Sequence, residues 1–337
     1  MNEQQRGESP ANWRAWVWQG GDSPLHLVNE EIEAPRLQAG QALVRNAVIG
    51  LNPVDWKVLG DPQMGWHAGH VPGVDGAGTV VAVGEGVPET WLGERVAYHQ
   101  SLHAHGSFAE YTPIMAHALM RVPDAVDFAV AASFPCPALT AWQALEKIPA
   151  RPAQHLLISG AGGSVGHYLV QLAKERGFRV SVMCNPRHAS RLSALGADEC
   201  LDGPLTPGEA WLERDVERFY AVIDCVNEDH AARLAPALLA NGHLVCIQGR
   251  VAQWPTTPFG RSLSLHEVAL GATHVYGDRA AWARLTQAGE GMLEAIATGR
   301  MQPEQYVVHP FSELGARLEA LKNRRFFGKS VIGCLDF

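Results

Sequence analysis

Three histidines, His99, His103 and His105, lie within a stretch of seven residues. Imidazole is the commonest side-chain ligand of zinc, and a catalytic zinc site needs three protein ligands. No cysteine precedes Cys136 and no CxxC pair occurs in the chain, so no thiolate from the first third could complete such a site. His103 and His105 are two residues apart, so they would face one ion only on a particular extended loop. The sequence leaves two alternatives: histidine ligands of a metal, or a polar loop without one.

A second candidate is a glycine-rich turn, GAGGSVG, between the apolar run 155–159 and a helical pattern over 165–177. Its glycines are spaced three apart, as in turns that let a pyrophosphate approach the backbone at a helix N-terminus. The turn is strong evidence only because a strand precedes it, a helix follows it and further strands come at suitable intervals. The residues predicted to contact a dinucleotide here are Gly160, Gly163, Ser164, Val165 and Gly166.

The residues after the next strand, 179–183, indicate which dinucleotide is bound. An NAD site usually has an acidic residue at the end of this strand, where it holds the ribose 2′-hydroxyl. Here Cys184 and Asn185 follow instead, with Arg187 and Arg191 close behind. Arginine can bind a 2′-phosphate with two hydrogen bonds. The sequence therefore favours NADPH over NADH, with Asn185 and Arg187 as cofactor contacts; the alternative is that the arginines form a solvated helix start.

Composition limits the class of protein. The 337 residues are 47% hydrophobic and 18% charged, which is typical of a packed enzyme of two domains. A net charge of −8 disfavours nucleic acid and anionic membranes as partners. No apolar run approaches the roughly 20 residues of a bilayer span, and the polar first residues lack a signal-peptide core. The six scattered cysteines suggest a reducing compartment. We expect a cytoplasmic protein.

The elements that must position these residues change character along the chain. Residues 12–120 contain short β-branched runs between turn residues, whereas a helical stretch begins at Asp127 and strands then alternate with helices. Such alternation predicts a parallel sheet covered on both faces. The expected fold is α/β, with a β-rich catalytic domain (1–126 and 277–337) and a doubly wound Rossmann domain (127–276). Strands of the second domain are predicted at 155–159, 179–183, 199–201, 221–226, 243–249 and 267–276.

The sequence resembles the medium-chain dehydrogenase/reductase superfamily over nearly its whole length. The segments that carry the resemblance, besides the glycine turn, are NPVDWK (52–57), VPGVDGAGTVVAVGEGV (71–87), GERVAYH (93–99), GSFAEY (106–111), PALTAWQAL (137–145) and GKSVI (328–332). The resemblance implies that the first domain is GroES-like. In zinc-dependent members the first two catalytic ligands are a cysteine in the segment 52–57 and a histidine where Val74 stands. Both are missing here, so the chain resembles the zinc-independent, quinone oxidoreductase-like branch and no zinc is expected.

The resemblance also suggests catalytic residues. Lys57 matches a position near the nicotinamide and is the first candidate for a cation that stabilises negative charge on the acceptor. Asn52 is expected to bind substrate or nicotinamide, and Asp55 to fix the loop or pair with Lys57. Thr140 matches a hydroxyl that lies against the nicotinamide, and His99 ends a strand from which it could touch substrate. The resemblance also predicts a structural role for Asp75.

Further cofactor contacts are expected at Val226, Gln248 and Gly249, which end two Rossmann strands, and at Lys329, in a Gly-Lys pair that often lies near the cofactor in relatives. In relatives the last sheet strand, here 267–276, pairs with its copy in a second subunit, so a homodimer is expected. The predicted function is NADPH-dependent hydride transfer to a quinone, an enone or a similar small molecule. Two alternatives remain: a zinc-dependent alcohol dehydrogenase with unusual histidine ligands, and a non-catalytic NADPH-binding protein.

Overall fold

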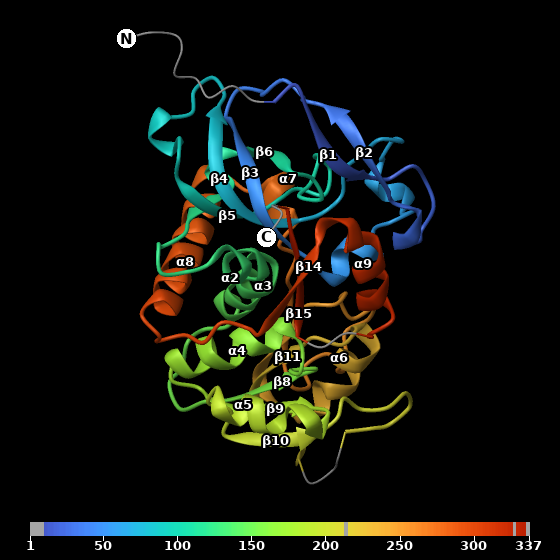
Figure 1. The fold of residues 1–337 in the computed structure, drawn as a ribbon. Coiled ribbons are helices and arrows are strands. Elements are labelled where there is room, and N and C mark those ends of the chain that lie inside the picture. Colours follow the sequence, from blue (N-terminus) through green and yellow to red (C-terminus); the bar gives the residue numbers. More distant parts are fainter. Residues whose placement is uncertain (1–9, 212–214, 326–327, 335–337) are drawn as a thin grey trace. The chain divides into compact units, whose positions relative to one another are not determined.

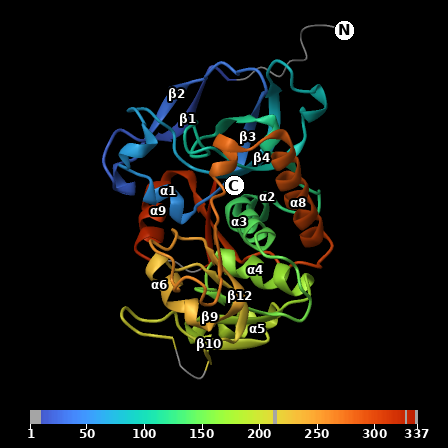
Figure 2. The same cartoon turned by 180° about the vertical axis from the view of Figure 1, so that it is seen from behind.

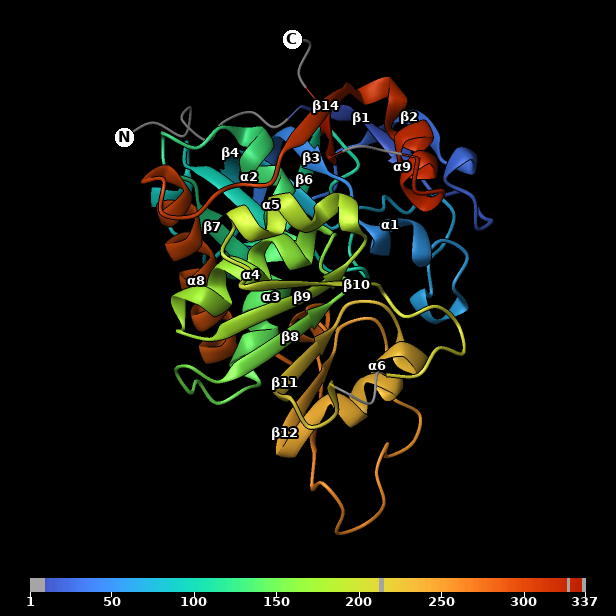
Figure 3. The same ribbon diagram turned by 90° about the horizontal axis from the view of Figure 1, so that it is seen from below.

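A computed structural model describes residues 10–211, 215–325 and 328–334. The chain forms two compact units, Met1–Cys136 with Gly271–Phe337, and Pro137–Leu270. Figures 1, 2 and 3 show their elements from three sides. None of the helices in the described ranges is both long enough and apolar enough to cross a bilayer.

The first unit is built on antiparallel strands. Its larger sheet has the order β14-β15-β3-β4-β5-β7, with β6 also paired to β3, and β1 pairs with β2 in a separate ribbon. Only β14 and β15 run parallel. The strands are β1 (Asn12–Val17), β2 (Val28–Glu33), β3 (Gln41–Gly50), β4 (Asp75–Val83), β5 (Arg95–His99), β6 (Tyr111–Met115), β7 (Leu119–Arg121), β14 (Tyr306–Pro310) and β15 (Lys329–Gly333). The C-terminal strand β15 therefore lies beside β3, near the start of the chain.

Helices pack against this sheet and against one another. Helix α2 packs on β3 and β4, and α9 packs against α1, as Figure 2 shows. The α-helices are α1 (Pro53–Lys57), α2 (Phe128–Ser133), α7 (Ala272–Tyr276), α8 (Arg279–Ala297) and α9 (Leu314–Lys322). The 3-10 turns are η2 (Pro24–His26), η3 (Pro62–Met64), η4 (Glu89–Trp91), η5 (Ala116–Ala118) and η9 (Phe311–Glu313). The core joins residues from both ends of the chain, among them Leu43, Ile49, Phe108, Phe311 and Ile332.

The second unit contains a six-stranded sheet whose strands all run parallel, in the order β10-β9-β8-β11-β12-β13. Helices α4 and α5 lie on one side of it and α6 on the other (Figure 3). This arrangement confirms the expected Rossmann-like fold. The elements are α3 (Pro135–Glu146), β8 (His155–Ser159), α4 (Ser164–Glu175), β9 (Arg179–Cys184), η6 (Pro186–His188), α5 (Ala189–Ala194), β10 (Glu199–Asp202), β11 (Phe219–Asp224), α6 (Glu228–Leu234), η8 (Ala235–Ala237), β12 (Leu238–Cys246) and β13 (Ser264–Glu267).

One predicted strand is wrong. The run 267–276 is not a strand: β13 ends at Glu267, and 272–276 form helix α7. Of the apolar residues that suggested a strand, Val268 and Leu270 are buried, whereas Val275 and Tyr276 are 54% and 86% exposed. The helical stretch predicted from Asp127 is also divided, into α2 and α3, at Phe134. Pro135 explains the division because proline cannot donate the hydrogen bond that would continue a helix.

Candidate active site

The first unit contains a buried polar cluster around Asn52. We call the side chains of Asn52, Asp55, Asp75 and Lys329 the Asn52 cluster. All four residues are 5% exposed or less. They come from the loop before α1, from α1 itself, and from the first residues of β4 and β15. Strand pairing brings them together, because β3 lies between β4 and β15 in the sheet and Asn52 follows β3 by two residues.

Hydrogen bonds connect the cluster from end to end. The Lys329 Nζ donates to Asn52 Oδ1 at 2.5 Å, and Asn52 Nδ2 donates to Asp75 Oδ2 at 2.9 Å. The backbone N–H of Cys136 donates to both oxygens of Asp75, at 3.1 and 2.9 Å. The amide of Asn52 therefore has its acceptor facing an ammonium and its donor facing a carboxyl group, which fixes its orientation.

Asp55 holds the loop that carries Asn52. Its Oδ2 accepts from the backbone N–H of Asn52 at 2.7 Å, and its Oδ1 accepts from that of Val74 at 3.1 Å. The first of these bonds belongs to a capping box, in which the residue at the third helical position closes the start of α1. Asp55 is thus a positioning residue for two segments, 52–57 and the residues before β4.

The cluster holds two buried carboxyl groups and one ammonium. Burial raises the pKa of Asp55 to about 8, against the hydrogen bonds to Asn52 and Val74 and with a contribution from the neighbouring Asp75. Burial raises the pKa of Asp75 to about 7, while Lys329 and the Cys136 N–H oppose the rise. The physical cause is the cost of placing charge where water cannot solvate it. The two carboxyl groups together therefore retain at least one proton near neutral pH.

Lys57 does not join this cluster. Its side chain is exposed, and its Nζ lies 5.8 Å from the centre of the Trp56 ring. Partial burial and the charge of Arg324 lower its pKa. The structure thus brings together two predicted catalytic residues, Asn52 and Asp55. The same cluster contains Asp75, which was predicted to be structural, and Lys329, which was predicted to contact the cofactor. Lys57, the first candidate for the catalytic cation, is not part of the cluster.

His99 is buried at the end of β5, 5% exposed, opposite Asp75 in the register of β4 and β5. Its Nδ1 lies 3.1 Å from Nε2 of His274 in α7, and the two rings stack. The His274 ring also meets the edge of Trp282. Burial lowers the pKa of both histidines, that of His274 to about 4. Both rings are therefore neutral at pH 7, and one donates to the other.

The other histidines of the loop lie elsewhere. His103 and His105 are exposed, and the Nδ1 of His105 accepts the Val71 backbone N–H at 3.2 Å. The His105 ring stacks on His70, which stacks on Trp66. Within the described part of the chain, no three histidine, cysteine, aspartate or glutamate side chains are grouped so that they could hold a metal ion. These histidines instead take part in ring stacking and backbone hydrogen bonding.

The glycine turn connects β8 to α4 in the second unit, and its glycines have different roles. Gly160 has a φ of +66°, a conformation that favours glycine. A Cβ at Gly166 would lie 2.1 Å from the Ala161 carbonyl oxygen, so close packing requires glycine there. Gly163 has an ordinary φ of −87° and precedes α4 directly, and a Cβ there would meet nothing within 4 Å. The open space at Gly163 and the α4 N-terminus, which carries Ser164 and Val165, fit a pyrophosphate.

The segment after β9 contains the residues predicted to select the cofactor. Asn185 Oδ1 accepts the Arg187 backbone N–H at 3.1 Å and so begins η6. Arg187 is exposed, and its Nε donates to His188 at 3.0 Å. Arg191 instead donates to the Gly162 carbonyl oxygen at 2.8 Å and lies 3.1 Å from His167 Nδ1. Arg187 is therefore the more accessible guanidinium, whereas Arg191 is bound to the glycine turn.

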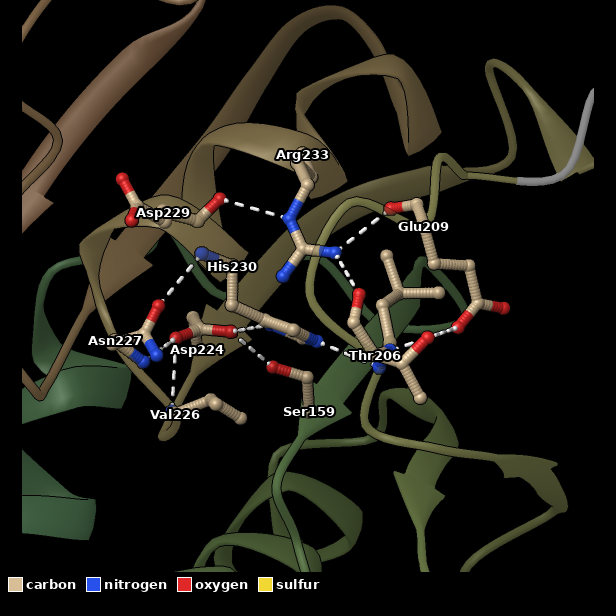
Figure 4. A network of polar contacts seen from close by, with 10 residues as sticks. Ser159, Thr206, Glu209, Asp224, Val226, Asn227, Asp229, His230 and Arg233 are labelled. Carbon is tan, nitrogen blue, oxygen red and sulfur yellow. Dashed lines mark hydrogen bonds and ion pairs between the residues drawn. The ribbon is translucent and has the colours of Figure 1, made fainter.

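A buried network that the sequence did not reveal fixes the turn after β11 (Figure 4). Asp224 Oδ2 accepts from Ser159 Oγ and from His230 Nδ1, both at 2.5 Å. Its Oδ1 accepts the backbone N–H of Val226 at 2.9 Å. Since Ser159 immediately precedes the glycine turn, one carboxylate links the two turns predicted to contact the cofactor. One feature of the sequence could have indicated this network, because Asp224 is a charged residue that ends an otherwise apolar strand.

The remaining predicted residues also lie in the second unit. Thr140 is in α3 and 8% exposed. Gln248 and Gly249 follow β12, and Gly249 has a φ of +87°. A Cβ at Gly249 would lie 3.0 Å from a carboxylate oxygen of Glu228 in α6. Gln248 and Gly249 thus lie beyond the carboxyl end of β12, at the edge of the sheet where parallel α/β folds bind ligands.

Two family models match the chain. The alcohol dehydrogenase GroES-like domain matches residues 38–124, and a domain described as zinc-binding dehydrogenase matches 195–332. These matches and the fold together define an oxidoreductase with a GroES-like domain and a Rossmann-like domain.

Individual relatives narrow the class. The chloroplast envelope quinone oxidoreductase homologue of Arabidopsis thaliana is 31% identical over 245 residues, covering 69% of this chain and 74% of the relative. The chloroplastic NADPH-dependent alkenal/one oxidoreductase of the same plant is 31% identical over 210 residues, 57% of this chain and about half (53%) of the relative. The solved quinone oxidoreductase of Coxiella burnetii is 23% identical, has a TM-score of 0.78 and covers 96% of this chain and 99% of its own, which shows a shared fold. The chain belongs to the medium-chain dehydrogenase/reductase superfamily, in its quinone oxidoreductase-like branch.

Proposed function

We propose that this protein is an NADPH-dependent reductase that transfers hydride to a quinone, an enone or a similar activated carbonyl compound without a metal ion. The observation that carries the proposal is the pair formed by the glycine turn, with open space at Gly163, and the accessible Arg187 after the neighbouring strand. Relatives named as quinone and alkenal/one oxidoreductases support the substrate class. The bound cofactor would supply hydride, and the protein would supply binding, orientation and charge stabilisation.

The residues proposed to hold the cofactor contact different parts of it. Backbone groups of the glycine turn and the α4 N-terminus would bind the pyrophosphate. Asn185 and Arg187 would contact the 2′-phosphate, and Val226, Gln248, Gly249 and Thr140 would line the remaining cofactor surface. The Arg187 Nη groups have no partner among the described residues, so both can meet phosphate oxygens.

The Asn52 cluster would take the place of a metal centre. Asn52 stands in the segment where zinc-dependent members carry a cysteine, and it faces the ammonium of Lys329 instead. Charge on an acceptor oxygen can be stabilised by oriented donors in a site that excludes water. In this proposal Asp55 and Asp75 orient the cluster, and no step requires a metal ion.

We also propose that residues 1–126 and 277–337 form the catalytic domain, that 127–276 bind the cofactor, and that the chain is a cytoplasmic homodimer. Strand β13 lies at the edge of its sheet and pairs only with β12 among the described strands. Such an edge can pair with a second copy. The mass in solution, measured by light scattering, tests whether the protein is a homodimer.

The experiment for the function is a substrate panel. NADPH and NADH oxidation is followed with benzoquinone, with methyl vinyl ketone as an enone, and with a saturated ketone as control. The proposal predicts that kcat/KM with NADPH exceeds that with NADH, and that the quinone or the enone exceeds the saturated ketone. Turnover of the saturated ketone alone would favour an alcohol dehydrogenase. NADPH binding without turnover of any acceptor would favour a binding protein.

A further inference from the structure

The ammonium of Lys329 is buried and incompletely paired. The residue is 5% exposed, and its Nζ has one hydrogen-bond acceptor among the described residues, Asn52 Oδ1 at 2.5 Å. No carboxylate of the described chain is close enough to it for an ion pair, although Asp75 and Asp55 lie near enough to feel its charge. An ammonium has three N–H donors. Two of them therefore have no acceptor among the residues that the structure describes.

Such an arrangement is costly unless something else meets those donors. Removing a charged group from water and leaving its hydrogen bonds unmade is strongly destabilising. Surface lysines avoid this cost by reaching water, as the exposed Lys57 can. Lys329 is held in place by strand β15, and its one partner, Asn52, is itself fixed by Asp75. The spare donors are thus fixed in direction, as in a site built to bind an oxygen atom.

We propose that Lys329 is a catalytic residue whose ammonium binds the carbonyl oxygen of the acceptor and stabilises the negative charge that develops on it. The inference rests on the proposed function, which supplies an acceptor of this class. It transfers to Lys329 the role that sequence reasoning gave to Lys57. Asn52 is then a positioning residue, since its Oδ1 holds the ammonium and its Nδ2 is held by Asp75.

The chemistry requires such a cation. Addition of a hydride to the β-carbon of an enone moves the π electrons through the α-carbon to the carbonyl oxygen, which becomes an enolate. The ammonium stabilises that oxygen without giving up its proton. The α-carbon then takes one proton from water, and the saturated ketone leaves. In a quinone, hydride that reaches one carbonyl oxygen makes the ring aromatic and leaves the other oxygen as a phenolate, which takes one proton from water to give the hydroquinone. Removing a single donor of this kind typically costs about 10²–10³-fold in kcat.

The first test measures binding and does not depend on turnover. The phenolate of 4-nitrophenol resembles the charged acceptor oxygen, and its ionisation is visible by absorbance. The probe is titrated into the protein saturated with NADP⁺, for wild type, Lys329→Met and a matched surface control, Lys147→Met. We expect wild type and Lys147→Met to lower the pKa of the bound phenol. We expect Lys329→Met to lose this lowering of the pKa, which corresponds to phenolate binding that is weaker by about tenfold or more relative to phenol.

Kinetics then separates acceptor from cofactor. We expect Lys329→Met to lower kcat with benzoquinone by about 10²–10³-fold while the Kd of NADPH changes by less than about threefold. If Kd rises instead and kcat at saturating NADPH is unchanged, Lys329 binds the cofactor and the inference is wrong. An equal phenolate titration in wild type and Lys329→Met, or no change in the pKa of the phenol in wild type, would also overturn it.

A second variant covers the case in which Lys329→Met does not fold. Lys329→Ala leaves room for a small amine, so ethylammonium added to it should restore phenolate binding and turnover, whereas the uncharged ethanol should not. Equal rescue by both, or by neither in a folded variant, argues against a cation at this position. If wild type turns over none of the quinones or enones but passes the phenolate test, the proposed function fails and the role of Lys329 as an oxyanion-binding group stands.

Discussion

The ammonium of Lys329 lies 2.5 Å from the side-chain oxygen of Asn52, although 277 residues separate the two in the chain. The contact exists because β15 pairs antiparallel with the end of β3, and Asn52 follows β3 by two residues. This contact places a positive charge of the protein beside the segment 52–57. Both residues are buried, so the charge acts where solvent screens it least.

The two raised carboxyl pKa values predict a stability profile. Asp55 has a pKa of about 8 in the folded protein against an ordinary 3.8, so the folded state binds more protons than the unfolded state between these values. The free energy of unfolding must then fall as pH rises from about 4 to about 8, by at most about 1.4 kcal/mol per pH unit for one such group. We expect Asp55→Asn to remove part of this decrease between pH 6 and 8.5, measured by denaturant unfolding. Identical slopes in wild type and variant would contradict the assigned pKa.

The buried histidine pair acts in the opposite direction. Burial lowers the pKa of His274 to about 4, so the unfolded state binds the extra proton as pH falls below about 6.5. Stability from the neutral ring is complete above that pH and is lost as pH falls towards 4. His274→Phe keeps a ring beside Trp282 and cannot protonate. We expect it to lose less stability than wild type between pH 7 and pH 5, in thermal unfolding at the two pH values. A larger loss in the variant would refute this.

The glycines of the turn should separate binding from folding. A Cβ at Gly163 meets no protein atom, so Gly163→Ala should fold with stability changed by less than about 0.5 kcal/mol. Its Cβ would occupy the space proposed for the pyrophosphate, and we expect NADPH affinity to fall by about tenfold or more. The matched variant Gly166→Ala should destabilise the fold by about 1–3 kcal/mol, because its Cβ would overlap the Ala161 carbonyl. Fluorescence titration measures the NADPH affinity of each variant, and denaturant unfolding measures its stability. Unchanged NADPH affinity in Gly163→Ala would show that the turn is not part of the cofactor site.

The two arginines after β9 should differ in effect. Arg187→Gln removes an accessible guanidinium, so we expect NADPH affinity to fall about tenfold while NADH affinity stays within about twofold. Arg191→Gln removes the bond to the Gly162 carbonyl that both cofactors would depend on, so it should weaken both to a similar extent. The ratio of the two dissociation constants is the readout. A ratio that changes with Arg191 and not with Arg187 would reverse the assignment.

The sequence predicted most of the Rossmann-like sheet because most of its strands are short apolar runs bounded by turns, and five of the six predicted strands coincide with observed strands over most of their length. The sixth prediction was wrong at 267–276, where Val275 and Tyr276 are exposed and length alone did not distinguish strand from helix. The sequence predicted Lys57 as the catalytic cation because it belongs to the motif NPVDWK. Only strand pairing across the chain reveals that Lys329 is the buried one, because its partner Asn52 lies in another segment.

The network around Asp224 was missed for a related reason. Its members Ser159 and His230 are unremarkable in sequence, and they meet only because β8 and β11 are neighbours and α6 follows β11. Local patterns predict elements and turns, whereas buried hydrogen-bonded groups depend on which strands become neighbours.

The most direct test of the central claim is turnover by the metal-depleted protein. Protein treated with chelator, and shown by elemental analysis to hold less than about one zinc per ten chains, is assayed for NADPH oxidation with benzoquinone, before and after zinc is added back. We predict full activity without metal and no gain on adding zinc, since the charge on the acceptor is met by the protein's own ammonium. Activity that is absent after chelation and restored by zinc would contradict the account and assign the chemistry to a metal centre.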